Sequence, residues 1–211
     1  MNKSILAVVG IGVIGGAVVL AYIHHYKTSP ALAVLVSTKT SYPQKQKMWD
    51  RLQATHQLDP LITELEQQIK RHPRAAVYPA LLGQAYLQKC STLHDINDQG
   101  ILAMQADKSF AVALSLDPSN WEARFTKAVA MSYWPPMLNK GQEVIDNFET
   151  LVQQQEAQPP QPQFAQSYAW LGDQYQKAGN EKQARSVWQH GAELYPGDTA
   201  LRQKLNQTAA R

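Results

Sequence analysis

Cys90 and His94 are four residues apart, and together they are the residues best suited to nucleophilic chemistry in this sequence. A reactive cysteine needs an adjacent base and usually a partner that orients that base. No third residue nearby is clearly arranged for that role, and two residues make an incomplete metal site. We therefore expect Cys90 to be a thiol at the end of a helix. A Cys/His-dependent enzyme is the third of three alternatives for the function.

The stretch Asp95 to Gly100, DINDQG, has some of the oxygen ligands of a calcium-binding loop. An EF-hand loop places ligands at its first, third and fifth positions, glycine at the sixth and a bidentate glutamate at the twelfth. Here the fifth position is Gln99 and the twelfth is Ala106, so we predict an exposed turn. The sequence also lacks a glycine-rich phosphate loop, a serine-centred motif and a pair of catalytic carboxylates. We therefore predict that the protein is not an enzyme and that it binds no cofactor.

The longest apolar segment, residues 5–23, contains no charged side chain. At about 1.5 Å per residue, a helix of this length spans the roughly 30 Å hydrocarbon core of a bilayer. We predict a transmembrane anchor over residues 1–27, with His24 and His25 at the membrane interface. The alternative is a cleaved signal peptide, although the apolar region of a signal usually has only about 7–15 residues.

A single N-terminal anchor most often keeps its N-terminus in the cytoplasm. We therefore expect a single-pass protein of a bacterial inner membrane, with its C-terminal domain in the periplasm. The formal net charge is +3, of which Lys3 and Lys27 supply two, so the remaining domain is nearly neutral. Because phosphate binding needs clustered lysine and arginine, nucleic acid is not an expected partner. With Cys90 as the single cysteine, no intrachain disulfide can form.

Beyond the anchor, the chain divides into a short connection and a helical domain. Residues 28–42 are expected to form a tether, because serine, threonine and proline surround one short apolar run, Ala31 to Val36. This run is interpreted as either a second half of the anchor or a short interfacial piece. From residue 43 onward almost every segment has the apolar spacing of an amphipathic helix, and none alternates as a strand does. The clearest helices are expected over residues 101–116, 121–133 and 142–155. We predict an all-α domain over residues 43–211.

Small and large residues recur at regular distances in the last third of the chain. A helical hairpin of about 34 residues needs small residues where its two helices touch, large ones where hairpins meet, and proline where the second helix ends. Gly172 and Ala184 are the small residues here, and Pro196 ends the second helix. The large residues are Tyr168, Leu171, Tyr175 and Trp188. This stretch resembles a tetratricopeptide repeat (TPR).

Two earlier hairpins match the same pattern with interruptions. The first combines residues 78–86 with 106–118, and the second combines 128–131 with 144–151. Extra residues lie within 89–105 and within 134–141. Leu61, Leu65 and Pro73 match the closing helix of a still earlier, degenerate unit. The resemblance implies a TPR-like α-solenoid of antiparallel helix hairpins: about three repeats with insertions and a capping helix, preceded by one transmembrane helix.

In the TPR family the first helices of the repeats line a concave groove that binds peptides. Some members clamp a terminal carboxylate with Lys, Asn and Arg, but Ala80, Thr126 and Trp170 replace those types, so no such clamp is expected. The expected groove is aromatic and amide-rich, which suits an extended peptide segment with few charges. The alternative is that Phe125 and Trp170 pack against neighbouring helices. By resemblance, the groove-facing residues are Gln84, Gln88, Phe125, Val129, Tyr133, Gln166, Trp170, Asp173 and Lys177.

The segment after residue 133 places large apolar side chains in a turn that ordinarily needs only a few polar residues. Trp134, Pro135, Pro136 and Met137 are predicted to form a contact surface for a membrane or periplasmic partner. Proline stiffens this segment, so little entropy is lost when it docks. The alternative is that Trp134 folds back over the repeat core.

Together, these features predict a membrane-anchored TPR scaffold or adaptor that binds protein partners. It would support recruitment or assembly of a membrane or periplasmic complex, with an extended peptide or a membrane complex subunit as partner. A narrower alternative rests on residues 61–88, which resemble the repeat region of bacterial cytochrome c maturation factors. Those proteins present apocytochrome to the haem-attachment machinery.

Overall fold

The computed structural model describes residues 28–209, and these residues form helices joined by short connections. No strand occurs among them, so the predicted all-α class is confirmed for this part of the chain. Two of the helices are short 3-10 turns, η1 and η2. The elements are α2 (Pro30–Val36), α3 (Tyr42–Ala54), α4 (Leu58–Arg71), α5 (Val77–Cys90), α6 (Ile96–Leu116), α7 (Trp121–Met131), η1 (Pro136–Leu138), α8 (Gly141–Glu156), η2 (Pro162–Phe164), α9 (Ala165–Lys177), α10 (Glu181–Leu194) and α11 (Thr199–Ala209).

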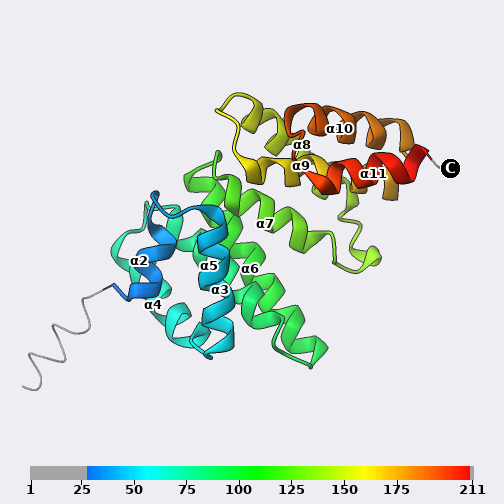
Figure 1. The fold of residues 1–211 in the computed structure, drawn as a ribbon. Coiled ribbons are helices and arrows are strands. Elements are labelled where there is room, and N and C mark those ends of the chain that lie inside the picture. The colour runs from blue at the N-terminus through cyan, green and yellow to red at the C-terminus, as the bar shows by residue number, and fades with distance from the viewer. Residues whose placement is uncertain (1–27, 210–211) are drawn as a thin grey trace, which may run out of the picture.

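The helices pair and stack in the order of the chain. Helix α5 pairs with α6, α7 with α8, and α9 with α10. Neighbouring pairs join through contacts of α6 with α7 and of α8 with α9, and α11 packs against both α9 and α10. Figure 1 shows this series running from the blue and cyan N-terminal helices to the red C-terminal helix α11. The predicted series of helix hairpins closed by a final helix is therefore present in the described residues.

Glycines mark the places where paired helices approach most closely. A Cβ atom on Gly172 would lie 2.1 Å from Trp188 Nε1, and one on Gly83 would lie 2.7 Å from the ring of Phe110. Both distances are too short for any side chain larger than hydrogen. The close approach lets Trp188 Nε1 donate a hydrogen bond of 3.1 Å to the carbonyl oxygen of Ala169. The regular spacing of small and aromatic residues is therefore a packing requirement between the two helices of the hairpins α5–α6 and α9–α10.

The N-terminal segment differs from the predicted tether. Residues 30–36 form α2, which begins at proline and is capped by Ser29, whose Oγ accepts a 3.1 Å hydrogen bond from the backbone of Leu32. Leu32 and Leu35 are completely buried and pack in one core cluster with α3, α4 and α5. The apolar run is therefore a core helix, because neighbouring helices cover its leucine face.

The connection before α6 is also shorter than predicted. Helix α6 begins at Ile96, whereas the sequence indicated a start near Ile101. The carboxylate of Asp95 accepts hydrogen bonds from the backbone of Asn97 (2.8 Å) and Asp98 (3.0 Å), which is the geometry of a helix N-cap. The prediction of an exposed turn over residues 95–100 is therefore wrong: apart from the cap itself, this stretch is the first part of α6.

Within residues 28–209, no helix is both long enough and apolar enough to cross a membrane. The predicted anchor, residues 5–23, lies outside the described residues, as do His24 and His25.

Candidate functional site

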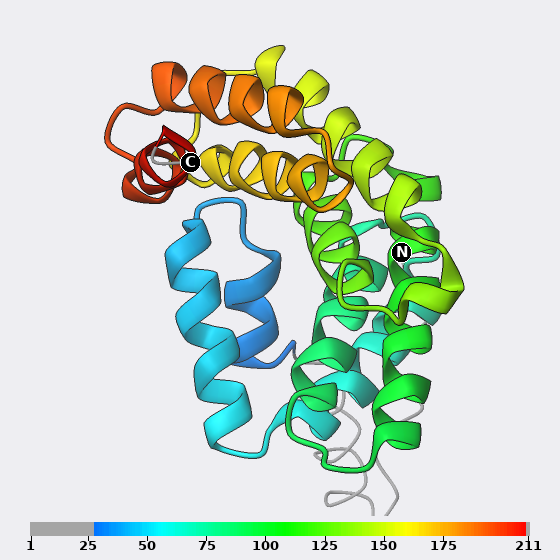
Figure 2. The same cartoon turned by 90° about the vertical axis from the view of Figure 1, so that its right-hand side faces the viewer.

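The inner side of the helical arc carries a cavity of about 290 Å³, which we call the inner cavity. Helices α2 and α3 lie on the inner side of the arc formed by α5 to α10 (Figure 2). The cavity lies between the end of α2, α3, the facing sides of α5 and α7, and the segment that leads into α9. Half of its lining residues are amide or aromatic: Gln46, Gln84, Asn120, Gln158, Gln161 and Gln163, with Tyr42, Trp49, Phe110, Trp121 and Phe164.

An ion pair and an aromatic contact hold α3 against α7 at the edge of this cavity. Lys45 Nζ lies 2.8 Å from Glu122 Oε1. The ring of Tyr42 meets the ring of Trp121 edge-on, with centroids 5.8 Å apart. Burial and then the charge of Glu122 raise the pKa of the Tyr42 phenol, so it stays neutral at physiological pH. Lys45 and Glu122 are 77 residues apart in the sequence, so this is a long-range contact that holds α3 in place beside the cavity.

Trp121, the aromatic partner of Tyr42, also lines the cavity and is held in place by two further contacts. Its ring stacks on Phe125 at a centroid distance of 4.7 Å, and its Nε1 donates a 3.1 Å hydrogen bond to Gln155 Oε1. Gln155, which is 2% exposed, donates in turn from Nε2 to the carbonyl oxygen of Phe164 at 3.2 Å. Because this chain of contacts joins α7, α8 and η2, the cavity wall is built before any ligand arrives.

The predicted groove residues of the first two hairpins do not form one surface. Gln84 lines the inner cavity, while Gln88 is half-buried one turn further along α5. Phe125 is buried in the core of the second hairpin, and Val129 and Trp170 pack against the same core. Trp170 also stacks on Phe148, with ring centroids 6.1 Å apart. Phe125 and Trp170 therefore pack against neighbouring helices, as in the alternative interpretation, and do not line an open groove.

The remaining groove residues are spread along α9 and the end of α7. Gln166 lines an open depression beside the inner cavity, and Tyr133 is 74% exposed with its ring edge against Trp170. Both carboxylate oxygens of Asp173 accept hydrogen bonds from Lys204 Nζ of α11, at 2.6 and 2.7 Å. Lys177 is exposed at the end of α9. Helix α11 therefore covers part of the face that the family resemblance assigned to the groove.

The residues of the predicted partner loop fall into two groups. Trp134 is partly buried against the core of the second hairpin, as in the alternative interpretation. Pro135 and Pro136 are exposed, and Met137 is 88% exposed. The segment thus turns one large side chain inward and one outward.

Cys90 and His94 do not form a catalytic pair in this structure. The Cys90 thiol contacts the carbonyl oxygen of Gln99 at 3.5 Å, and burial raises the pKa of this thiol, which disfavours the nucleophilic thiolate. His94 is exposed. Among residues 28–209, no group of three or more His, Cys, Asp and Glu side chains is placed to hold a metal ion.

Comparisons with known proteins bear on the fold. No protein-family model matches the chain, and no curated protein matches it in sequence. Among solved structures, it is similar to TTC0263, a thermophilic TPR protein of Thermus thermophilus, with 13% identity and a TM-score of 0.59 over 94% of this chain and 97% of that one. It is similar to MamA at 20% identity and a TM-score of 0.55, covering 74% and 80% of the two chains. A chain of the APC/C hetero-tetramer Cut9-Hcn1 also matches at 20% identity and a TM-score of 0.55, with 82% of this chain and 28% of that chain covered.

The chain has a TPR-like fold. Within that fold, sequence reasoning missed the residues that α3 and the connection before α9 bring to the inner cavity. Tyr42, Lys45 and Trp49 lie before the three hairpins that match the repeat pattern, so that pattern carries no signal for them. The glutamines at positions 158, 161 and 163 stand out in composition, but only the folded TPR-like stack places them opposite α3.

Proposed function

We propose that this protein is a membrane-anchored TPR scaffold that binds an extended segment of a protein partner. The observation that carries the proposal is the inner cavity, whose amide side chains can pair with a peptide backbone while its aromatic rings cover apolar side chains. Lys45 and Glu122 neutralise each other, so the lining has little net charge and favours a segment with few charges. A fixed wall at Trp121 reduces the entropy lost on binding.

A crosslinking experiment in native membranes tests the site. A photoreactive residue at Gln161, an exposed position that lines the cavity, is expected to trap a protein partner. The matched control is the same residue at Lys108, an exposed position on α6 that does not line the cavity. Adducts of equal yield from both positions, or none from Gln161, would contradict the proposed site.

The membrane part of the proposal rests on the apolar sequence of residues 5–23 and has its own test. The full chain is expected to stay in the membrane fraction after alkaline carbonate extraction. A variant that lacks residues 1–27 should appear in the soluble fraction. Protease accessibility in spheroplasts then tests the periplasmic placement of the domain. Release by carbonate of a protein whose mass is smaller by the N-terminal segment would favour a cleaved signal peptide.

A narrower candidate is a factor that presents apocytochrome for haem attachment. It is favoured by residues 61–88, whose resemblance to such factors covers α4 and α5, and these two helices pack directly against each other. The candidate predicts that a peptide containing Cys-X-X-Cys-His binds the full chain more tightly than the same peptide with both cysteines replaced by serine. Equal affinity for the two peptides would exclude this function and leave the general scaffold intact.

A further inference from the structure

A second cavity, of about 360 Å³, lies at one edge of the molecule between the second and third hairpins. We call it the edge cavity. It is bounded by the end of α7, the segment 132–140, the start of α8 and the end of α9. Most of its wall is apolar and comes from Met131, Trp134, Pro135, Pro136, Val144 and Ile145. The volume is in the range of about 300–1,000 Å³ that small ligands occupy.

The segment 132–140 is held in a defined conformation. Trp134 packs against the core of the second hairpin, and residues 136–138 form the short helix η1. Asn139 ends that helix with a left-handed backbone (φ 48°), and its N–H donates a 2.9 Å hydrogen bond to the carbonyl oxygen of Pro136. The wall of the edge cavity is therefore formed without a ligand, which lowers the entropy cost of binding.

One polar group of the edge cavity lacks a partner. Gln174 lines the cavity and is 6% exposed, and its Nε2 is buried from solvent and has no hydrogen-bond partner among residues 28–209. A buried donor without an acceptor destabilises the protein that contains it. A ligand with an acceptor beside an apolar group would supply the missing hydrogen bond when the amide turns toward it. This amide is the observation that points to a ligand.

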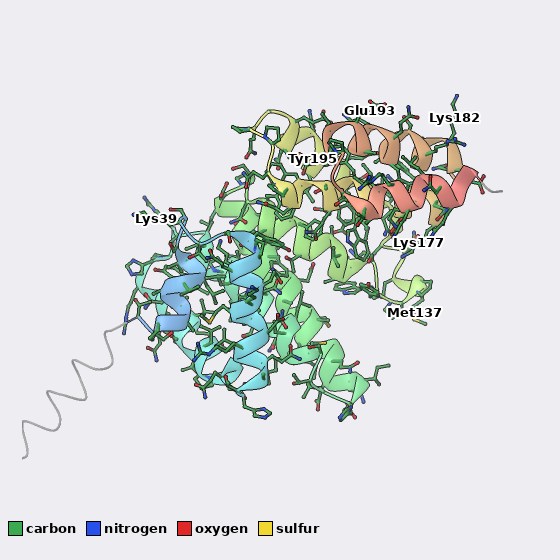
Figure 3. All side chains as sticks on the ribbon, in the orientation of Figure 1. Lys39, Met137, Lys177, Lys182, Glu193 and Tyr195 are labelled. Carbon is green, nitrogen blue, oxygen red and sulfur yellow. The ribbon has the colours of Figure 1, made fainter. Side chains whose placement is uncertain are left out.

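The charged side chains around the cavity indicate which kind of ligand group would lie next to that acceptor. Lys177 is exposed at the rim, one turn after Gln174, and no carboxylate is among the residues that line the cavity. Lys140 also lines it, but its ammonium lies 2.6 Å from Glu143 Oε2 and is neutralised there. Figure 3 shows Lys177 and Met137 at the same edge of the molecule. The rim therefore favours an anionic group beside the buried apolar one.

We propose that the edge cavity binds an internal protein segment in which an apolar residue is followed by Asp or Glu. The apolar side chain enters between Trp134 and Ile145, its backbone carbonyl accepts a hydrogen bond from Gln174, and the acidic side chain pairs with Lys177. This inference rests on the proposed scaffold function and adds a second contact point to it.

The test uses the detergent-solubilised full chain and a fluorescently labelled peptide, acetyl-Gly-Gly-Leu-Glu-Gly-amide, with anisotropy as the measurement. Replacing leucine by glycine in the peptide should weaken binding at least tenfold, because the apolar contact is lost. Replacing glutamate by glutamine should weaken it about twofold to fivefold, as for a solvent-exposed ion pair.

Three protein variants locate the interaction. Lys177→Gln should weaken the glutamate peptide by the same factor and leave the glutamine peptide unchanged. Lys182→Gln, an exposed lysine at the start of α10 (Figure 3), is the matched control and should change neither. Gln174→Leu should weaken both peptides about threefold to tenfold. Its melting temperature should be unchanged or higher, because the unpaired donor is gone.

Three results would overturn the assignment: no binding of the first peptide, equal affinity for its glutamate and glutamine forms, or unchanged affinity in Gln174→Leu. Binding only of a peptide that ends in a free leucine carboxylate would also overturn it, since the cavity would then take chain ends. If the peptide does not bind but Gln161 still crosslinks a partner, only the proposal for the edge cavity is rejected. If neither peptide binding nor crosslinking from Gln161 is observed, the proposed scaffold function is rejected as well.

Discussion

At the residue scale, the glycines of this fold have two distinct roles that the sequence does not separate. Gly172 faces Trp188, and a Cβ atom there would lie 2.1 Å from the indole nitrogen. Gly100 lies near the start of α6, and a Cβ atom there would meet nothing within 4 Å. The repeat pattern identified Gly172 as a contact residue because its position in the repeat is defined by packing. It carried no information on Gly100, which lies in an insertion.

The two glycines give a matched pair of substitutions. Gly172→Ala should lower the free energy of unfolding by about 1–3 kcal/mol, because the added methyl group forces α9 and α10 apart. Gly100→Ala should raise it by about 0.5–1 kcal/mol, because alanine favours the helix and clashes with nothing. Urea denaturation followed by circular dichroism measures both. A Gly172→Ala variant as stable as the parent would show that α9 and α10 are less tightly packed than described.

At the element scale, sequence patterns predicted most helices well and the short N-terminal helix α2 poorly. Hairpins α7–α8 and α9–α10 have long amphipathic helices with clear stops, and their observed bounds lie close to those expected. Helix α2 has only seven residues, which is too short for a helical period to be recognised, and its burial depends on contacts with α3 and α5. The inner cavity could not be predicted either. It depends on contacts between α3 and α7, which are far apart in the sequence.

Helix α2 therefore offers a direct test of whether residues 28–42 belong to the folded domain. Leu35 is completely buried, so Leu35→Ala should lower the free energy of unfolding by about 2–5 kcal/mol. Lys39→Ala, at an exposed position just beyond the helix, is the control and should change it by less than about 0.5 kcal/mol. Thermal or urea unfolding of the full chain in detergent is the measurement. If both variants unfold like the parent, residues 28–42 act as the tether that the sequence suggested.

At the scale of the whole molecule, stability is distributed along the chain. The N-terminal core cluster joins α2, α3, α4 and α5, and a C-terminal cluster joins α9, α10 and α11. No residue of the described range 28–209 belongs to both clusters, and the second hairpin lies between them. In stacked hairpins each unit contacts only its neighbours, so stability is approximately a sum of local and nearest-neighbour contributions. Helix α3 is the exception, because its ion pair with α7 passes over the hairpin α5–α6. Helix α11 adds an ion pair to α9 of the adjacent hairpin.

This arrangement predicts that damage at one end of the stack stays local. Leu65 is completely buried in the N-terminal cluster. Leu65→Ala should lower the free energy of unfolding of that cluster by about 2–5 kcal/mol. Hydrogen–deuterium exchange should then rise in α2, α4 and α5 and stay unchanged in α10 and α11, because local opening does not require the distant hairpin to open. Leu201→Ala, in the C-terminal cluster, is the reciprocal variant and should give the opposite pattern. A uniform rise in exchange along the chain for either variant would mean that the contacts of α3 and α11 make the whole arc one cooperative unit.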